Sequence, residues 1–95
     1  MSVQAVERTV VILNPAGLHA RPSVAVAKIV RRFEAKVEIR TSYQTADAGD
    51  VLQLLSLGAP CGTELVLSAT GPDAEKVLDD LCRLFSTPFG LDGEA

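Results

Sequence analysis

The chain has 95 residues, of which 47% are hydrophobic and 22% are charged. This length suits one compact domain, and the composition is typical of globular proteins. No apolar run approaches the roughly 18 residues of a membrane-spanning helix, and the first residues lack the pattern of a secretory signal. We therefore expect a single domain over residues 1–95, located in the cytoplasm without membrane insertion, with a loose tail at about 91–95.

The net charge of −3 is unevenly distributed along the chain. Residues 1–40 carry seven basic and three acidic side chains, whereas residues 41–95 carry two basic and nine acidic ones. This asymmetry predicts a basic face suited to an acidic partner surface or an anionic ligand. The aromatic content is only 4%, without Trp, which argues against nucleic-acid binding by base stacking. Cys61 and Cys82 show no metal-ligand spacing, so we expect reduced thiols, no metal and no cofactor.

The first half of the chain predicts a strand, a helix and a hairpin. β-branched residues indicate a strand over Val6–Ile12, and the turn formers of segment 14–17 end it. A helix should begin just before Pro22, because proline is tolerated in a first helical turn. Polar and apolar residues alternate over Lys36–Arg40, which predicts a half-buried strand. A short strand around Tyr43–Ala46 should pair with it. The apolar residues of the helix recur at helical spacing and predict a buried stripe of Ala25, Val26, Ile29, Val30 and Phe33.

The second half predicts a short helix, a strand and a final helix. Asp50 is a suitable N-cap, with Gln53 three residues later, for a helix ending near Gly58. Residues 63–69 alternate as a strand with Leu65, Leu67 and Ala69 facing inward. Residues 71–73 open a helix that stops before Pro88, with a buried face of Ala74, Val77, Leu78, Leu81 and Phe85. The order βαββαβα predicts an α+β open-faced β-sandwich, with a four-stranded antiparallel sheet and three helices on one face.

The single histidine lies where the chain enters the first helix. In Gly17-Leu18-His19-Ala20-Arg21-Pro22, it stands between a glycine turn and the first helical turn. Backbone N–H groups at a helix start bind anions, and the helix dipole adds positive potential. That potential favours a neutral, nucleophilic imidazole on His19, and the Arg21 guanidinium offers a bidentate fork to phosphate oxygens. The pattern predicts a histidine that accepts a phosphoryl group.

The helix after His19 should present a basic exposed face to a partner. A helical wheel places one apolar residue among the basic ones, all opposite the buried stripe: Arg21, Val24, Lys28, Arg31 and Arg32. The alternative is an ordinary solvated basic helix, as most charged stretches are. The proximity of His19 favours a docking role.

The Gly-Leu-His-Ala-Arg-Pro string closely resembles the active-site motif of the HPr family, the histidine-containing phosphocarriers of the bacterial phosphotransferase system. The resemblance extends over nearly the whole chain, including Val10 to Gly17, Leu55-Ser56-Leu57-Gly58, Gly62-Thr63 and Ser68-Ala69-Thr70-Gly71. It implies that enzyme I transfers a phosphoryl group to Nδ1 of His19, and that the carrier passes it to an enzyme IIA domain. It also implies a transfer intermediate rather than an independent enzyme, with sugar transport as one destination of the phosphate.

The resemblance assigns further roles to individual positions. His19 is the phosphoacceptor and Arg21 its electrostatic partner, while Gly17, Ala20, Arg21 and Pro22 form the phosphate-binding helix start. The positions that match partner-facing residues are Val24, Lys28, Arg31, Val51, Leu52 and Leu55. The apolar run Val51, Leu52, Leu54 and Leu55 must also supply part of the core. A carrier that docks two partners in turn on one face is best served as a monomer.

Asp50 occupies the position of the regulatory serine found in many members of the family. A kinase cannot phosphorylate aspartate, so we expect no serine-based regulation there. Asp50 either caps the helix, as serine also would, or supplies a permanent negative charge that mimics phosphoserine.

One other pathway and two other functional classes compete with sugar transport. The segment 84–89 resembles the nitrogen-related paralogue of the family, which would use His19 in the same way. A purely regulatory binding protein would report flux through the state of His19. An independent hydrolase would need a second acid or base and a substrate pocket, and the sequence indicates neither.

Overall fold

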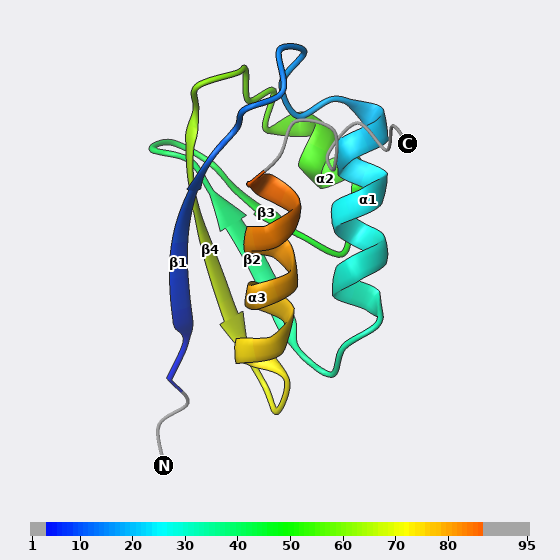
Figure 1. The fold of residues 1–95 in the computed structure, drawn as a ribbon, viewed down its shortest axis with the longest axis vertical. Helices are drawn as coiled ribbons and strands as arrows, with labels where there is room; N and C mark the ends of the chain where they lie inside the picture. The colour runs from blue at the N-terminus through cyan, green and yellow to red at the C-terminus, as the bar shows by residue number, and fades with distance from the viewer. Residues whose placement is uncertain (1–3, 87–95) are drawn as a thin grey trace.

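The computed structural model describes residues 4–86, so Pro88 and the tail predicted at 91–95 lie outside the described residues. Within that range the elements follow one another as β1 (Val6–Val11), α1 (Ala20–Arg31), β2 (Lys36–Arg40), β3 (Thr45–Asp47), α2 (Val51–Ser56), β4 (Glu64–Thr70) and α3 (Ala74–Phe85) (Figure 1). The predicted order βαββαβα is confirmed.

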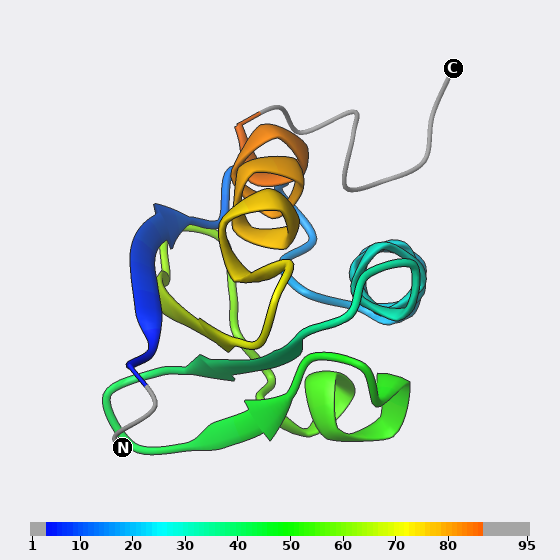
Figure 2. The ribbon, with the colours of Figure 1, turned by 90° about the horizontal axis from the view of Figure 1, so that it is seen from below.

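The four strands form one sheet in the spatial order β1-β4-β2-β3, and every neighbouring pair is antiparallel. Ala69 of β4 is paired with Val6 of β1 on one side and with Val37 of β2 on the other. The predicted hairpin of β2 and β3 is present, with Ile39 opposite Ala46. The helices lie on one side of the sheet, and its other face is open (Figure 2). The predicted open-faced α+β sandwich is confirmed.

The core lies between the sheet and the helices. α3 packs on β1 and β4, α2 lies beside β3, and α1 packs against both other helices. Because side chains alternate across a strand, each strand places every second residue in this layer. The predicted inward faces of β4 and α3 are confirmed as buried: Leu65, Leu67, Ala69, Ala74, Val77, Leu78, Leu81 and Phe85.

Three local predictions were inexact. The predicted strand around Tyr43 begins later, at Thr45, because the Thr41 side chain and backbone hold residues 41–44 in a turn. Tyr43 consequently lies in that turn and is 73% exposed. Ala25 of α1 is only partly buried, and so is Phe33, which follows the end of that helix.

Candidate functional site

His19 is positioned by a loop with several internal backbone hydrogen bonds. The Gly17 amide donates to the Asn14 carbonyl at 3.0 Å, and the Asn14 side-chain amide donates back to the Gly17 carbonyl. The Leu18 amide donates to the Ala59 carbonyl at 2.8 Å, which ties the loop to the segment after α2. Leu18 is buried, whereas His19 is half-buried. The loop therefore holds the imidazole at the surface on a backbone anchored to the core.

Gly17 fits this loop for two separate reasons. Its φ of +75° lies in the left-handed region, which residues with a side chain rarely adopt. A Cβ at this position would also lie 2.6 Å from the Ala59 carbonyl oxygen. Gly17 therefore contributes the backbone path to the candidate site, and a larger residue would displace the Ala59 segment.

The start of α1 presents backbone donors beside His19. His19 is the N-cap, with extended backbone angles of φ −94° and ψ −163°, and its side chain makes no capping hydrogen bond. Its carbonyl accepts from the Ser23 amide at 3.0 Å. Ala20 and Arg21 supply N–H groups of the first turn, which a helix does not pair with its own carbonyls, whereas Pro22 supplies none. A phosphate-binding helix start formed by Gly17, Ala20, Arg21 and Pro22 thus stays a prediction, in which the first two amides of α1 and the side chain of the exposed residue Arg21 would be the donors.

The exposed face of α1 is basic, as its sequence predicts. α1 contains no acidic residue, and Arg21, Lys28 and Arg32 are exposed along or just after it. Val24 is 39% exposed within this face. Lys28 and Arg32 have no carboxylate within ion-pair distance in residues 4–86, so these two cations remain available to a partner.

α2 adds apolar surface next to α1. Leu52 is 75% exposed and Leu55 is 37% exposed, whereas Leu54 is fully buried. Val51 is intermediate and packs partly against the core, so it serves the fold as well as the predicted interface. The structure thus divides the apolar run of α2 into one core residue, one shared residue and two exposed residues.

Asp50 is the N-cap of α2. Its carboxylate accepts from the Leu52 amide at 3.0 Å and from the Gln53 amide at 3.2 Å, so the capping prediction is confirmed. Gln53 departs from the usual capping box, because its side-chain oxygen accepts from the Asp47 amide at 2.9 Å rather than from the Asp50 amide. The side-chain amide of Gln53 instead donates to the Asp50 carboxylate at 3.4 Å.

The turn that carries Asp50 lies beside the C-terminal turn of α1, away from His19. A Cβ at Gly49 would lie 3.7 Å from Val30 Cγ1, and the Gly49 carbonyl accepts two hydrogen bonds from Arg31. Val30 is eleven residues after His19, which corresponds to about 16 Å along a helix axis. This placement makes capping the role of Asp50 that the structure displays.

The contact between Arg31 and Gly49 was missed by the sequence reasoning, which treated Arg31 only as a partner-facing cation. Arg31 Nε and Nη2 donate to the Gly49 carbonyl oxygen at 3.0 and 2.8 Å. Eighteen residues separate the two positions, so no local spacing rule indicates this contact.

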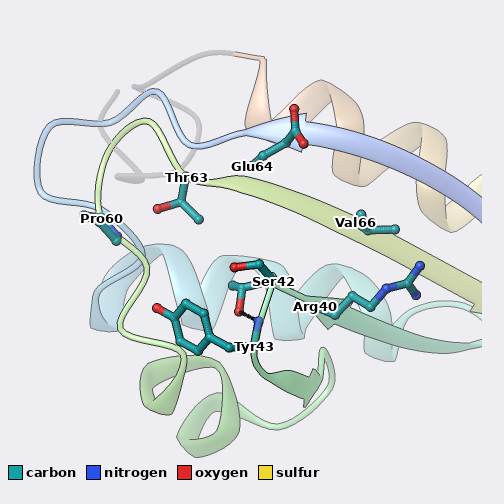
Figure 3. Close-up of a pocket in the computed structure, with 8 residues that line it drawn as sticks. Arg40, Ser42, Tyr43, Pro60, Thr63, Glu64 and Val66 are labelled. Carbon is teal, nitrogen blue, oxygen red and sulfur yellow. Dashed lines mark hydrogen bonds between the residues drawn. The ribbon is translucent and has the colours of Figure 1, made fainter.

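A broad concavity within residues 4–86 lies elsewhere. It has a volume of about 660 Å³ and is lined by the turn between β2 and β3, including Ser42 and Tyr43, and by the segment leading into β4, including Pro60 and Thr63 (Figure 3). Neither His19 nor Arg21 lines it. The candidate site lies at a helix start where His19 is half-buried and Arg21 is exposed, a form suited to a reacting group delivered by another protein.

Within the described range, no group of three or more His, Cys, Asp or Glu residues is arranged to hold a metal ion. Cys61 and Cys82 are free cysteines. Among residues 4–86, none of the helices has the length and apolar character needed to cross a bilayer.

Comparison with known proteins relates the fold and the histidine loop to one family. Residues 6–87 match the family model described as "PTS HPr component phosphorylation site". The chain is 34% identical over 84 residues to phosphocarrier protein HPr of Treponema pallidum (strain Nichols), covering 88% of this chain and 96% of the relative. It is 36% identical over 88 residues to phosphocarrier protein NPr of Escherichia coli (strain K12), covering 92% and 98%.

A similar solved structure is that of HPr-C-His from Thermoanaerobacter tengcongensis. Its TM-score is 0.84 at 29% sequence identity, with 95% of this chain and 98% of that chain covered. The similarity therefore extends to the whole fold.

Proposed function

This chain belongs to the HPr family of phosphocarrier proteins, and we propose that it carries a phosphoryl group in a phosphotransferase system with His19 as the acceptor. The observation that carries the proposal is the position of His19: half-buried, at the N-cap of a helix whose first turn contains an exposed arginine. In this role the chain is a transfer intermediate rather than an independent enzyme, because its phosphorylated form is the product of one partner and the substrate of the next.

The chemistry requires little of the protein beyond a nucleophile and anion-binding groups. The lone pair of neutral His19 Nδ1 forms a bond to phosphorus as the bond to the donor breaks, and the donor retains that bonding pair. The Arg21 guanidinium and the first amides of α1 stabilise the phosphoryl oxygens, and the positive end of the helix dipole adds to this. Gly17 and Pro22 shape the loop and the helix start around the anion.

Partners dock on the surface that surrounds His19. We assign the donor as an enzyme I and the acceptor as an enzyme IIA domain, both of which meet the basic face of α1 and the exposed side chains of α2. The apolar centre of this surface consists of Val24, Leu52 and Leu55, and Lys28 contributes charge beside it. One surface that serves two partners in turn favours a monomer, acting in the cytoplasm.

The destination of the phosphate distinguishes sugar transport from regulation. The relatives include proteins named HPr and proteins named NPr at similar identity, so a nitrogen-related or purely regulatory carrier is the second candidate. In the second candidate, the output depends on the phosphorylation state and not on sugar uptake.

Mass spectrometry of the intact protein tests the proposal. The wild type and His19→Ala are incubated with phosphoenolpyruvate and an enzyme I. We expect one added phosphoryl group in the wild type, labile in acid, stable in base and absent from H19A. Phosphorylation of H19A at the wild-type level would assign the acceptor elsewhere. An unmodified wild type with its cognate enzyme I would contradict both phosphorylation-dependent candidates, and the motif would then serve binding alone.

A further inference from the structure

α2 is too short to position itself. It spans six residues, Val51–Ser56, and its one fully buried side chain is Leu54. Isolated helices of this length are unstable in water, because the cost of nucleation exceeds the gain from so few hydrogen bonds. The orientation of its exposed residues, Leu52 and Leu55, therefore depends on what holds its ends.

Hydrogen bonds at the N-terminus of α2 order the turn internally. Asp50 caps the helix, the Asp47 carboxylate accepts from the Gly49 amide at 2.8 Å, and Gln53 connects back to Asp47 and Asp50. All of these bonds join residues within the segment 47–53. They shape the turn, but they do not attach it to α1.

Arg31 makes that attachment. Its guanidinium directs two donors, Nε at 3.0 Å and Nη2 at 2.8 Å, onto the Gly49 carbonyl oxygen. Charge-assisted hydrogen bonds of this kind are stronger than neutral ones, and the planar fork fixes direction as well as distance. Arg31 lies twelve residues after His19, or about 18 Å along the helix, so it does not act on the phosphoryl group directly.

We propose that Arg31 is a positioning residue, which holds the turn at Gly49 against α1 and so keeps Leu52 and Leu55 preformed for partner docking beside His19. The inference rests on the proposed carrier function. Preorganisation lowers the cost of association, because the docking surface does not have to be ordered during binding. Arg31 thereby acts through α2, and Lys28 and Arg32 remain as the charges that a partner meets.

The chain provides a matched control for the test. Arg32 is the next residue, is exposed and carries the same charge, and in residues 4–86 it has no ion-pair partner. Arg31→Gln, Arg31→Lys and Arg32→Gln are compared with the wild type. R31K keeps the charge but lacks the planar fork, and it provides a mild variant should R31Q fold poorly.

Three measurements separate positioning from charge. Hydrogen exchange of the Leu54 amide, which donates to the Asp50 carbonyl at 3.1 Å, reports the order of α2. KM and kcat for phosphorylation by phosphorylated enzyme I report docking and transfer. The rate of His19 phosphorylation by phosphoramidate, a small chemical donor, reports the site without protein docking.

We expect R31Q to accelerate hydrogen exchange at the Leu54 amide. We also expect the KM of R31Q to exceed that of R32Q by about fivefold or more, because R31Q loses a charge-assisted hydrogen bond. R31K should fall between R31Q and the wild type, while kcat and the phosphoramidate rate stay unchanged. Equal KM values for R31Q and R32Q with unchanged exchange, or wild-type behaviour of R31K, would overturn the inference. If the wild type is not phosphorylated on His19, the carrier function fails, and the exchange comparison still decides whether Arg31 orders α2.

Discussion

At Gly17, backbone conformation and steric space both exclude a side chain. A φ of +75° costs an alanine about 1–2 kcal/mol, and the Cβ would also meet the Ala59 carbonyl oxygen at 2.6 Å. That carbonyl accepts the Leu18 amide and so holds the loop that presents His19. The position of the candidate phosphoacceptor thus depends on a residue that cannot contact the phosphate through a side chain.

Substitution of two glycines separates the conformational cost from the steric cost. Gly58 also has a positive φ, of +56°, but a Cβ there would have no atom within 4 Å. We expect Gly58→Ala to lower the free energy of unfolding by about 1 kcal/mol and Gly17→Ala by about 3 kcal/mol, because only the latter adds a clash. Urea denaturation measures both values. Equal losses would show that the Ala59 segment moves aside without cost.

At the scale of elements, the surroundings of Asp50 favour its role as a helix cap over its role as a mimic of phosphoserine. The carboxylate accepts two amides of α2, and its turn is attached to the end of α1 away from His19. The intervening length of α1 exceeds the Debye length of about 8 Å at physiological ionic strength, so direct repulsion of the phosphate should be weak.

Two substitutions at Asp50 test this assignment. Asp50→Asn removes the charge and keeps a good capping residue, whereas Asp50→Ala removes both. We expect D50N to keep a phosphoryl-transfer rate within about twofold of the wild type, and D50A to lose about 1 kcal/mol of stability in urea denaturation. A rise in the transfer rate of D50N to several times the wild-type rate would instead support the mimic.

Local sequence patterns anticipated the elements better than their contacts. Alternation predicted β2 and β4, helical spacing predicted the buried residues of α3, and the Asp50 cap was identified from residue type alone. These are properties of consecutive residues, which a single sequence displays. The placement of β4 between β1 and β2, and the contact of Arg31 with Gly49, join residues far apart in the chain. No periodicity encodes such contacts.

In the candidate site too, the local motif was predictable from the sequence, whereas the long-range surroundings were not. His19 and Arg21 belong to one contiguous motif, so the sequence was sufficient to propose them together. The surroundings of these two residues could be described only from the structure. Only the solvent exposure of the side chains there separates Leu52, which faces solvent, from Leu54, which is in the core. Val51 packs partly against the core and also belongs to the predicted interface. Residue type alone does not reveal which apolar side chains of a six-residue helix face the core and which face a partner.

At the scale of the whole molecule, ion pairs neutralise basic side chains on the strands, whereas some basic side chains on or just after α1 have no such partner within residues 4–86. Arg8 forms ion pairs with Glu75 and Asp79, and Arg40 pairs with Glu7 on the open face of the sheet. These exposed pairs contribute little to stability, but they balance the charge of the strands. The cations that remain without carboxylate partners in residues 4–86 include Lys28 and Arg32, so positive charge available to a partner lies along the exposed face of α1 and at its C-terminal end.

This distribution predicts that salt slows partner docking. A basic face with no acidic residue on α1 attracts an acidic partner at long range, and mobile ions screen that attraction. We expect kcat/KM for phosphorylation by enzyme I to fall at least threefold, roughly, between about 50 and 300 mM NaCl, with a smaller change in kcat. Steady-state kinetics at varied carrier concentration measure both.

Two lysines locate the source of the salt effect. Lys28 and Lys76 are both exposed. Lys28→Gln removes a cation from the basic face of α1, and Lys76→Gln removes one from α3. We expect K28Q to lower kcat/KM at low salt and to flatten its salt dependence, because it removes one of the charges that steer the partner. K76Q should behave as the wild type, because Lys76 lies on α3 and not on the basic face of α1. Similar flattening in both variants would mean that net charge, and not the face of α1, governs association.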